Sequence, residues 1–96
     1  MEIFIFARAH ALPGREAEVE RAIRQVLPET RKEPGCLGAH AYRSVKDASL
    51  FYVHSRWRDE VAFDLHTRLS HTVRFVETLE PLLDHEFVAA RTTEMA

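Results

Sequence analysis

The chain has 96 residues, 46% of them hydrophobic and 29% charged, and its formal net charge is −2. These values are typical of one globular domain, expected here over residues 1–96, and they exclude a disordered chain or a basic nucleic-acid-binding surface. Cys36 is the only cysteine, which excludes an internal disulfide and a cysteine zinc cluster and favours a cytoplasmic location. The sequence has no signal-peptide pattern and no apolar run near the roughly 20 residues of a membrane helix, so no membrane partner is expected.

The first half of the chain predicts a strand, a helix and a hairpin. Residues Glu2–His10 are rich in β-branched and aromatic side chains on both faces, which is typical of a central strand. Residues 15–35 have an amphipathic helical pattern, with a kink or a new turn expected at Pro28. Two further strands, Cys36–Val45 and Leu50–Trp57, flank a short polar turn and predict a hairpin. The helix has a buried stripe of Val19, Ala22, Ile23, Val26, Leu27 and Thr30.

The second half predicts a broken helix pair and a last strand. Asp59 is placed to cap a short helix, and Ser70 is a candidate cap for a second helix that ends near residue 83. Between them the helical pattern is interrupted at Arg68–Ser70. Residues Glu86–Thr93 predict the final strand. The second helix has a buried stripe of Phe75, Val76, Leu79, Leu82 and Leu83.

This order of elements predicts an α+β fold of the ferredoxin-like βαββαβ type, with the helices on one face of a four-stranded antiparallel sheet. The other face then lacks a cover, although apolar strand residues are expected on it. We therefore expect this face to pack against a second copy of the chain, as a homodimer.

Four stretches of the sequence form a specific set: TRKEPGCLGAHAYR (Thr30–Arg43), FYVHSRW (Phe51–Trp57), the pair Asp59-Glu60, and LHTRLSH (Leu65–His71). Together they resemble the antibiotic biosynthesis monooxygenase domain family over nearly the whole chain. The resemblance implies a dimeric α+β barrel, in which each protomer holds a pocket between its sheet and its helices. Members of the family include cofactor-free oxygenases of phenols and quinols, heme-degrading oxygenases and an isomerase of a phosphorylated sugar.

The resemblance also shows two departures from family patterns. Heme-degrading members use an Asn on the first strand and a Trp in the second helix region, and the corresponding positions here are Ala7 and His66. Heme degradation is therefore not expected, and no cofactor is expected. The family often has a Glu two residues before Trp57, where this chain has Ser55.

His66 and His71 raise the question of a metal site. On a continuous helix, five residues turn through about 500°, which leaves the two rings about 140° apart. Ligand pairs on one helix face instead use spacings of three or four residues. A helix break could bring the rings together, but no carboxylate or cysteine cluster is evident to complete the ligand set, so no metal is expected.

As an acid or base, His66 is the stronger candidate of the two. It follows Phe63 on an apolar stripe that can face the pocket, and the pKa of a histidine suits proton transfer near neutral pH. The alternative is a buried histidine that only fixes the helix. His71 is expected to cap its helix or contact the dimer partner, and otherwise to contribute to substrate binding. The remaining histidines are expected at solvent or at the dimer face: His10, His40, His54 and His85.

Aromatic side chains complete the candidate substrate site. Trp57 and Phe63 are expected as pocket walls, with core packing as the alternative for Trp57, and Phe75 is a further substrate-binding candidate. Tyr42 and Tyr52 have hydroxyl groups that could orient a phenol or quinone oxygen. The pattern leaves open which of these two tyrosines faces inward.

These residues predict a cofactor-independent monooxygenase that acts on a small hydroxylated aromatic ligand, such as a quinol or an anthrone. In this chemistry a base deprotonates the phenol, the carbanion passes an electron to oxygen, and a dry pocket protects the radical pair. Two alternatives remain open. One is a non-catalytic small-molecule-binding or stress protein, and the other is an isomerase or lyase that uses the same histidine.

Overall fold

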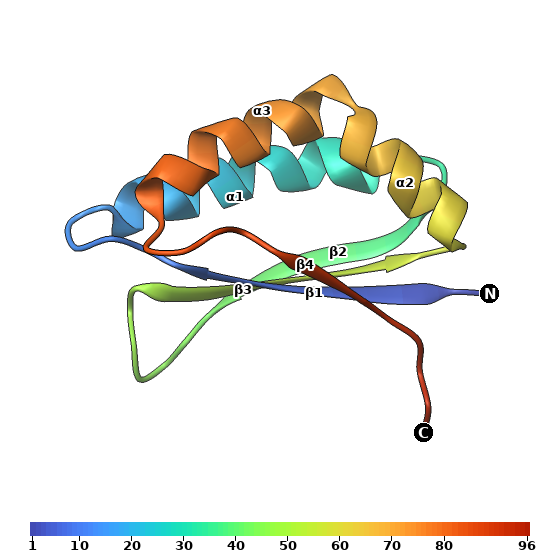
Figure 1. Cartoon of the computed structure of the whole chain (residues 1–96), viewed down its shortest axis with the longest axis horizontal. Helices are drawn as coiled ribbons and strands as arrows, with labels where there is room; N and C mark the ends of the chain where they lie inside the picture. Colours follow the sequence, from blue (N-terminus) through green and yellow to red (C-terminus); the bar gives the residue numbers. More distant parts are fainter.

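The computed structural model describes residues 1–96 and has two layers, with all helices over one face of a sheet (Figure 1). The strands are β1 (Ile3–His10), β2 (Cys36–Arg43), β3 (Leu50–Trp57) and β4 (Ala89–Thr92). The helices are α1 (Glu16–Arg31), α2 (Glu60–Arg68) and α3 (Ser70–Leu79), followed by a 3₁₀ turn, η1 (Glu80–Leu82). This order confirms the predicted βαββαβ arrangement, with the second helix broken in two.

The sheet is antiparallel and has the strand order β2-β3-β1-β4, so the prediction that the first strand is central is confirmed. Odd-numbered residues of β1, such as Ile5, face the helices and are buried, whereas even-numbered residues such as Phe6 face the other side. Ser55 is paired with Ile5 and shares its face. The two outer strands are shorter than predicted. Strand β2 ends at Arg43, because Ser44 Oγ accepts hydrogen bonds from the amides of the following turn. Strand β4 starts only at Ala89.

Helix α1 covers the sheet with the predicted stripe, and all six stripe residues are buried. The helix continues through Pro28 to Arg31, so the new turn expected at this proline is absent. Pro28 lies on the exposed side of the helix, where it removes one backbone donor but disturbs no core contact. Packing of the buried stripe therefore outweighs the local preference of proline.

The N-cap of α3 is Leu69, one residue before the expected cap, Ser70. Asp59 caps α2 as predicted, because its carboxylate accepts a hydrogen bond from the Ala62 amide at 2.8 Å. Ser70 does not cap α3. Leu69 has an extended backbone (φ −69°, ψ 146°) and supplies the carbonyl that accepts from the amides of Thr72 and Val73. Ser70 is already the first helical residue.

A close approach at Gly35 joins the α1–β2 loop to the second helical segment. A Cβ atom at Gly35 would lie 2.3 Å from the Cβ of Ala62 on α2. The Gly35 carbonyl also accepts a hydrogen bond from the Arg58 amide at 2.9 Å. Glycine is therefore required by the neighbouring helix and not by its own backbone angles, since its φ is not positive.

We predict that Gly35→Ala destabilises the protein by about 1–3 kcal/mol, because a new methyl group overpacks the contact with α2. Ala62→Gly removes the clashing methyl group at a helix-propensity cost of about 1 kcal/mol. In urea unfolding, the double variant should then lose clearly less stability than the summed losses of the two single variants. Gly38→Ala is the matched control, because its Cβ would meet only the His40 ring at 3.7 Å. Strict additivity would contradict the proposed contact.

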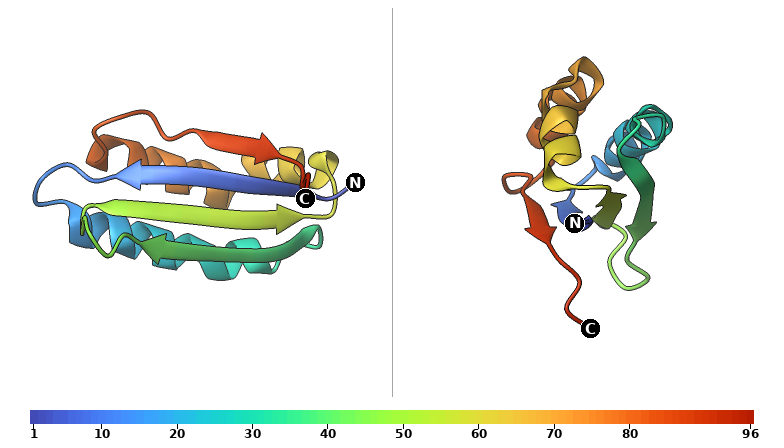
Figure 2. Two further views of the ribbon diagram at one scale, coloured as in Figure 1. Left: turned by 90° about the horizontal axis from the view of Figure 1, so that it is seen from below. Right: turned by 90° about the vertical axis from the view of Figure 1, so that its right-hand side faces the viewer.

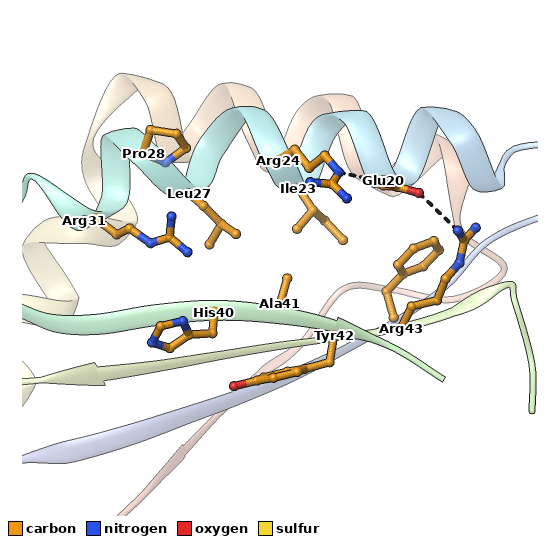
Figure 3. A pocket seen from close by; sticks show the side chains of 11 residues that line it. Glu20, Ile23, Arg24, Leu27, Pro28, Arg31, His40, Ala41, Tyr42 and Arg43 are labelled. Carbon is orange, nitrogen blue, oxygen red and sulfur yellow. Dashed lines mark hydrogen bonds and ion pairs between the residues drawn. The ribbon is translucent and has the colours of Figure 1, made fainter. Parts of the chain in front are cut away.

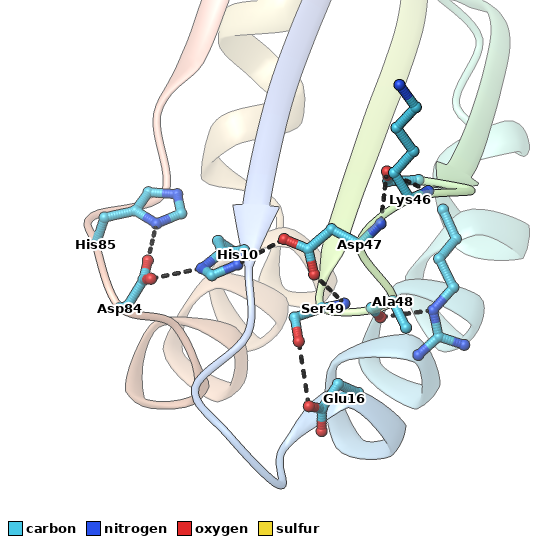
Figure 4. A network of polar contacts seen from close by, with 10 residues as sticks. His10, Glu16, Lys46, Asp47, Ala48, Ser49, Asp84 and His85 are labelled. Carbon is cyan, nitrogen blue, oxygen red and sulfur yellow. Dashed lines mark hydrogen bonds and ion pairs between the residues drawn. The ribbon is translucent and has the colours of Figure 1, made fainter.

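At the opposite end of the sheet, a network of charged side chains joins three segments (Figure 4). His10 at the end of β1 contacts Asp84 through Nδ1 at 2.5 Å and Asp47 through Nε2 at 3.1 Å. His85 contacts the second oxygen of Asp84 at 2.6 Å. Since both ring nitrogens of His10 face carboxylates, its imidazole must carry both protons. Hydrogen bonding to Asp84 accordingly raises the pKa of His10 above its ordinary value of 6.5.

We predict that this network stabilises the fold most between the ordinary pKa values of aspartate, 3.8, and histidine, 6.5. A raised histidine pKa gives stability that is complete below 6.5 and is lost as the pH rises through the folded-state pKa. The difference in melting temperature between the wild type and His10→Gln should therefore shrink from pH 6 to pH 9. The exposed His40→Gln serves as control, and an equal pH dependence in both variants would rule out the network as the cause.

The sheet face opposite the helices is bare, as predicted (Figure 2). It forms a shallow hollow of about 730 Å³ that is lined by apolar and aromatic side chains from all strands and from Val88. The residues after β4 leave the molecule on this side, away from the helices. None of the helices is long and apolar enough to cross a membrane.

Candidate functional site

A cavity of about 180 Å³ lies between the sheet and the helices. Its floor comes from all four strands, with Ala39 as the contribution of β2, and its roof comes from α1, α2 and α3. The lining is mainly apolar, but it includes His66 and the hydroxyl-bearing residues Thr30, Ser55, Thr67 and Thr72. His66 is therefore the single ionisable side chain in a small and mainly apolar space.

His66 lies in this cavity, where α2 holds its ring against two aromatic side chains. The ring centroid lies 4.6 Å from that of Trp57 and 5.5 Å from that of Phe63. Nδ1 contacts Glu33 Oε2 at 2.8 Å and Thr72 Oγ1 at 3.3 Å. Nε2 has no hydrogen-bond partner. Every fully buried side-chain nitrogen or oxygen of the chain does have one. Nε2 is therefore not fully buried.

Glu33 joins the two histidines of the stretch LHTRLSH. Its Oε2 atom contacts His66 Nδ1 at 2.8 Å and His71 Nε2 at 2.7 Å. An ionised carboxylate only accepts hydrogen bonds, so both of these ring nitrogens must carry a proton. With its proton on Nδ1, a neutral His66 has its lone pair on Nε2.

This cluster corrects the sequence-based argument against a shared site. That argument allowed that a helix break could bring the rings together, and the extended backbone of Leu69 does so, with the His66 and His71 ring centroids 6.2 Å apart. It also found no carboxylate, whereas Glu33 reaches both rings from the α1–β2 loop. The close approach of Gly35 to α2 explains why this loop lies near enough.

Burial lowers the pKa of His66, and the hydrogen bond and negative charge of Glu33 oppose that effect only in part. The imidazole is therefore neutral near pH 7 and able to accept a proton. Cys36 lies near the same loop, and burial raises the pKa of its thiol, so it does not supply a thiolate.

The aromatic candidates Trp57, Phe63 and Phe75 occupy two environments, the cavity wall and the buried core. Phe63 lines the cavity from α2, and Phe75 lines it from α3 while packing edge-on against Phe87. Trp57 is completely buried and does not line the cavity, which agrees with its alternative role in core packing. Its indole Nε1 donates to Ser55 Oγ at 2.9 Å, so the serine that replaces the family's Glu fixes the ring beneath His66.

The remaining candidates lie outside the cavity. Tyr42 and Tyr52 both project from the bare face of the sheet, because their even-numbered positions alternate away from the helices. His71 lines a separate cleft of about 350 Å³ between α1 and α3. Thus the structure brings His66, Phe63 and Phe75 together at the cavity, places His71 beside it through Glu33, and separates the two tyrosines from it.

Glu33 and Thr72 are site residues that sequence reasoning missed. Glu33 lies in the stretch TRKEPGCLGAHAYR that carries the family resemblance, but no pattern in the sequence indicated a role of its own. An acidic residue beside a Pro-Gly turn was the available signal. Thr72 is buried beside His66, and nothing in its spacing distinguished it from other helix residues.

A larger groove of about 490 Å³ runs between α1 and the edge strand β2 (Figure 3). Three guanidinium groups line it, from Arg24, Arg31 and Arg43. Glu20 pairs with two of them, and Arg31 donates to the Ala39 carbonyl at 2.9 Å. Because these groups already have partners and the groove is open at the surface, we place the candidate site in the smaller, more apolar cavity.

The fold and the cavity together define a small α+β protein with an internal, mainly apolar cavity. A sequence model of the family described as antibiotic biosynthesis monooxygenase matches residues 3–78. The chain belongs to this family.

Several solved structures share this fold. The protein PA3566 from Pseudomonas aeruginosa is 29% identical, with a TM-score of 0.90 over 99% of this chain and 95% of that one. Rv0793 from Mycobacterium tuberculosis is 19% identical, with a TM-score of 0.93 over 100% and 97%. A protein named antibiotic biosynthesis monooxygenase is 22% identical, with a TM-score of 0.90 over 98% and 99%. No curated protein sequence matches the chain.

Proposed function

We propose that the protein is a cofactor-independent monooxygenase of a small hydroxylated aromatic molecule, with His66 as the catalytic base. The observation that carries the proposal is the unpartnered Nε2 of His66 at an apolar cavity, with Nδ1 held by Glu33. Membership of the monooxygenase family supports the reaction type. The substrate class and the absence of a cofactor are our inference.

The reaction begins when Nε2 of His66 accepts the phenol proton of a quinol. The electron-rich ring then passes one electron to O2, and the two radicals combine to place a peroxide on a ring carbon. Loss of water leaves a new carbonyl, and the proton held by His66 returns to the leaving oxygen. One quinol and one O2 thus give one hydroxyquinone and one water, so the substrate supplies all of the electrons. The apolar lining excludes water that would release the radicals.

The volume of the cavity restricts the substrate. An apolar cavity of about 150 Å³ in another protein holds benzene, and the cavity here measures about 180 Å³. A single substituted ring is therefore a better fit than the three fused rings of an anthrone. Within the predicted range of substrates, we favour a monocyclic quinol.

We predict that a chelator-treated sample consumes oxygen with a monocyclic quinol, and that His66→Ala lowers the rate by about 10²–10⁴-fold, the usual contribution of a general base. An oxygen electrode measures the rate over a panel of quinols. His40→Ala is the matched control, because it removes an exposed histidine from the bare face. Uptake no greater than that of His66→Ala across the panel would remove the proposal.

The same panel separates the two alternative functions. A quinol that raises the melting temperature without being consumed would favour a non-catalytic binding protein. Product formation under nitrogen would instead favour an isomerase or lyase that uses His66 to move a proton at carbon.

We further propose that the protein acts as a homodimer through its bare sheet face. Phe6, Tyr42, Tyr52 and Val88 each expose more than two fifths of their surface there. Such a contiguous apolar surface is characteristic of an interface. The residues after β4 extend on the same side, where they can reach a facing copy (Figure 2).

We predict a mass in light scattering of twice the 11.1 kDa chain at micromolar concentration. Phe6→Glu should shift the protein toward monomer, because it places a charge in the centre of the proposed interface. Val61→Glu is the control, since Val61 is comparably exposed but lies on the outer side of α2. A monomeric wild type would refute the dimer without affecting the proposed chemistry.

A further inference from the structure

We propose that Glu33, His66 and His71 form a binding site for one divalent transition-metal ion. The ion would replace the two hydrogen bonds that now converge on Glu33 Oε2. The metal site itself does not depend on the proposed oxygenase function.

The three donor atoms already lie at nearly the required separation. One oxygen of Glu33 and one nitrogen of each histidine lie within 4.8 Å of one another. Zinc bonds to nitrogen and oxygen of about 2.0–2.2 Å place tetrahedral ligands about 3.3 Å apart. The contacts of 2.8 and 2.7 Å to Glu33 therefore need to lengthen by roughly half an ångström. Glu33 lies in a loop and can move by this amount, and the two imidazole nitrogens must approach each other from within 4.8 Å to the same separation.

Burial and charge also favour a cation here. The side chains of Glu33, His66 and His71 are only 9%, 14% and 18% exposed. Neither a lysine nor an arginine pairs with Glu33, whose only side-chain partners are the two imidazoles. A bound cation would neutralise this shielded carboxylate. The cavity beside His66 and the cleft beside His71 leave room for water ligands.

The donor set indicates which ions fit. Two imidazoles with one carboxylate suit zinc, cobalt, nickel or ferrous iron, whereas magnesium and calcium prefer oxygen ligands only. Structural zinc sites usually have four protein ligands. A site with three protein ligands leaves a coordination position for water, as in catalytic zinc sites.

Metal binding changes the protonation of both rings without a net release of protons from neutral histidines. The proton on His66 Nδ1 must move to Nε2, and the proton on His71 Nε2 must move to Nδ1, before each freed nitrogen can donate its lone pair. His66 Nε2 then becomes a hydrogen-bond donor. If the proposed function is correct, the metal-loaded protein therefore loses its base, and the ion inhibits oxygen uptake.

The test uses cobalt(II) with the full chain in the absence of any substrate. We expect one equivalent to bind in calorimetry, with d–d absorption bands in the visible range. Glu33→Gln and His71→Gln should each weaken binding by at least tenfold. Because His10 and His85 form a second cluster with Asp84, a His10→Gln/His85→Gln variant provides the background control and should bind cobalt as the wild type does.

A second measurement needs no variant and so holds even if Glu33→Gln fails to fold. In ¹⁵N spectra of the wild type, zinc should shift Nδ1 of His66 and Nε2 of His71 and leave the His10 and His85 resonances unchanged. The proposal is overturned if these two nitrogens do not respond, if cobalt binds equally well without Glu33, or if the control variant abolishes binding. Since neither experiment measures turnover, a failed oxygen-uptake assay has no bearing on either result.

Discussion

One oxygen atom, Glu33 Oε2, accepts hydrogen bonds from residues on two helices, and the candidate site depends on that shared contact. The contact requires three local features at once. The α1–β2 loop must approach α2 closely, which Gly35 permits beside Ala62. The helix must break at Leu69 so that His71 turns back toward His66. Each hydrogen bond to a charged group contributes about 1.5–3 kcal/mol, which helps offset the cost of shielding the carboxylate from water.

The periodic parts of the fold were predictable from the sequence, because burial imposes a regular pattern on them. The stripe of α1 and the apolar residues of β1 identified a helix over a central strand. The cap at Asp59 was predictable for a local reason, since its side chain satisfies the first free amides of α2. Ends of elements were less predictable, as Pro28 shows, because tertiary packing decides whether a weak turn survives.

The site was predictable only in part, because it joins segments that are distant in the chain. His66 and Phe63 lie on one short helix, so their spacing places both at the cavity. Glu33 lies more than thirty residues earlier, and its contact with His66 depends on how the loop folds against α2. The face of the sheet on which Tyr42 and Tyr52 lie depended on strand register. A shift of one residue exchanges the two faces of a strand, and loose alternation in β2 did not determine which face Tyr42 would occupy.

Strand register also separates the cavity from the proposed dimer surface. In the pairing of β1 with β3, Ile5 and Ser55 lie opposite each other beneath the helices, while Phe6 and His54 lie opposite each other on the bare face. The first pair contributes to the cavity, and the second pair stacks its rings with centroids 4.5 Å apart at the proposed dimer surface. Since neighbouring residues serve opposite faces, a substitution such as Phe6→Glu can alter assembly while the cavity keeps its lining. The same alternation means that a dimer partner on the bare face would not enter the cavity, which lies on the other side of the sheet.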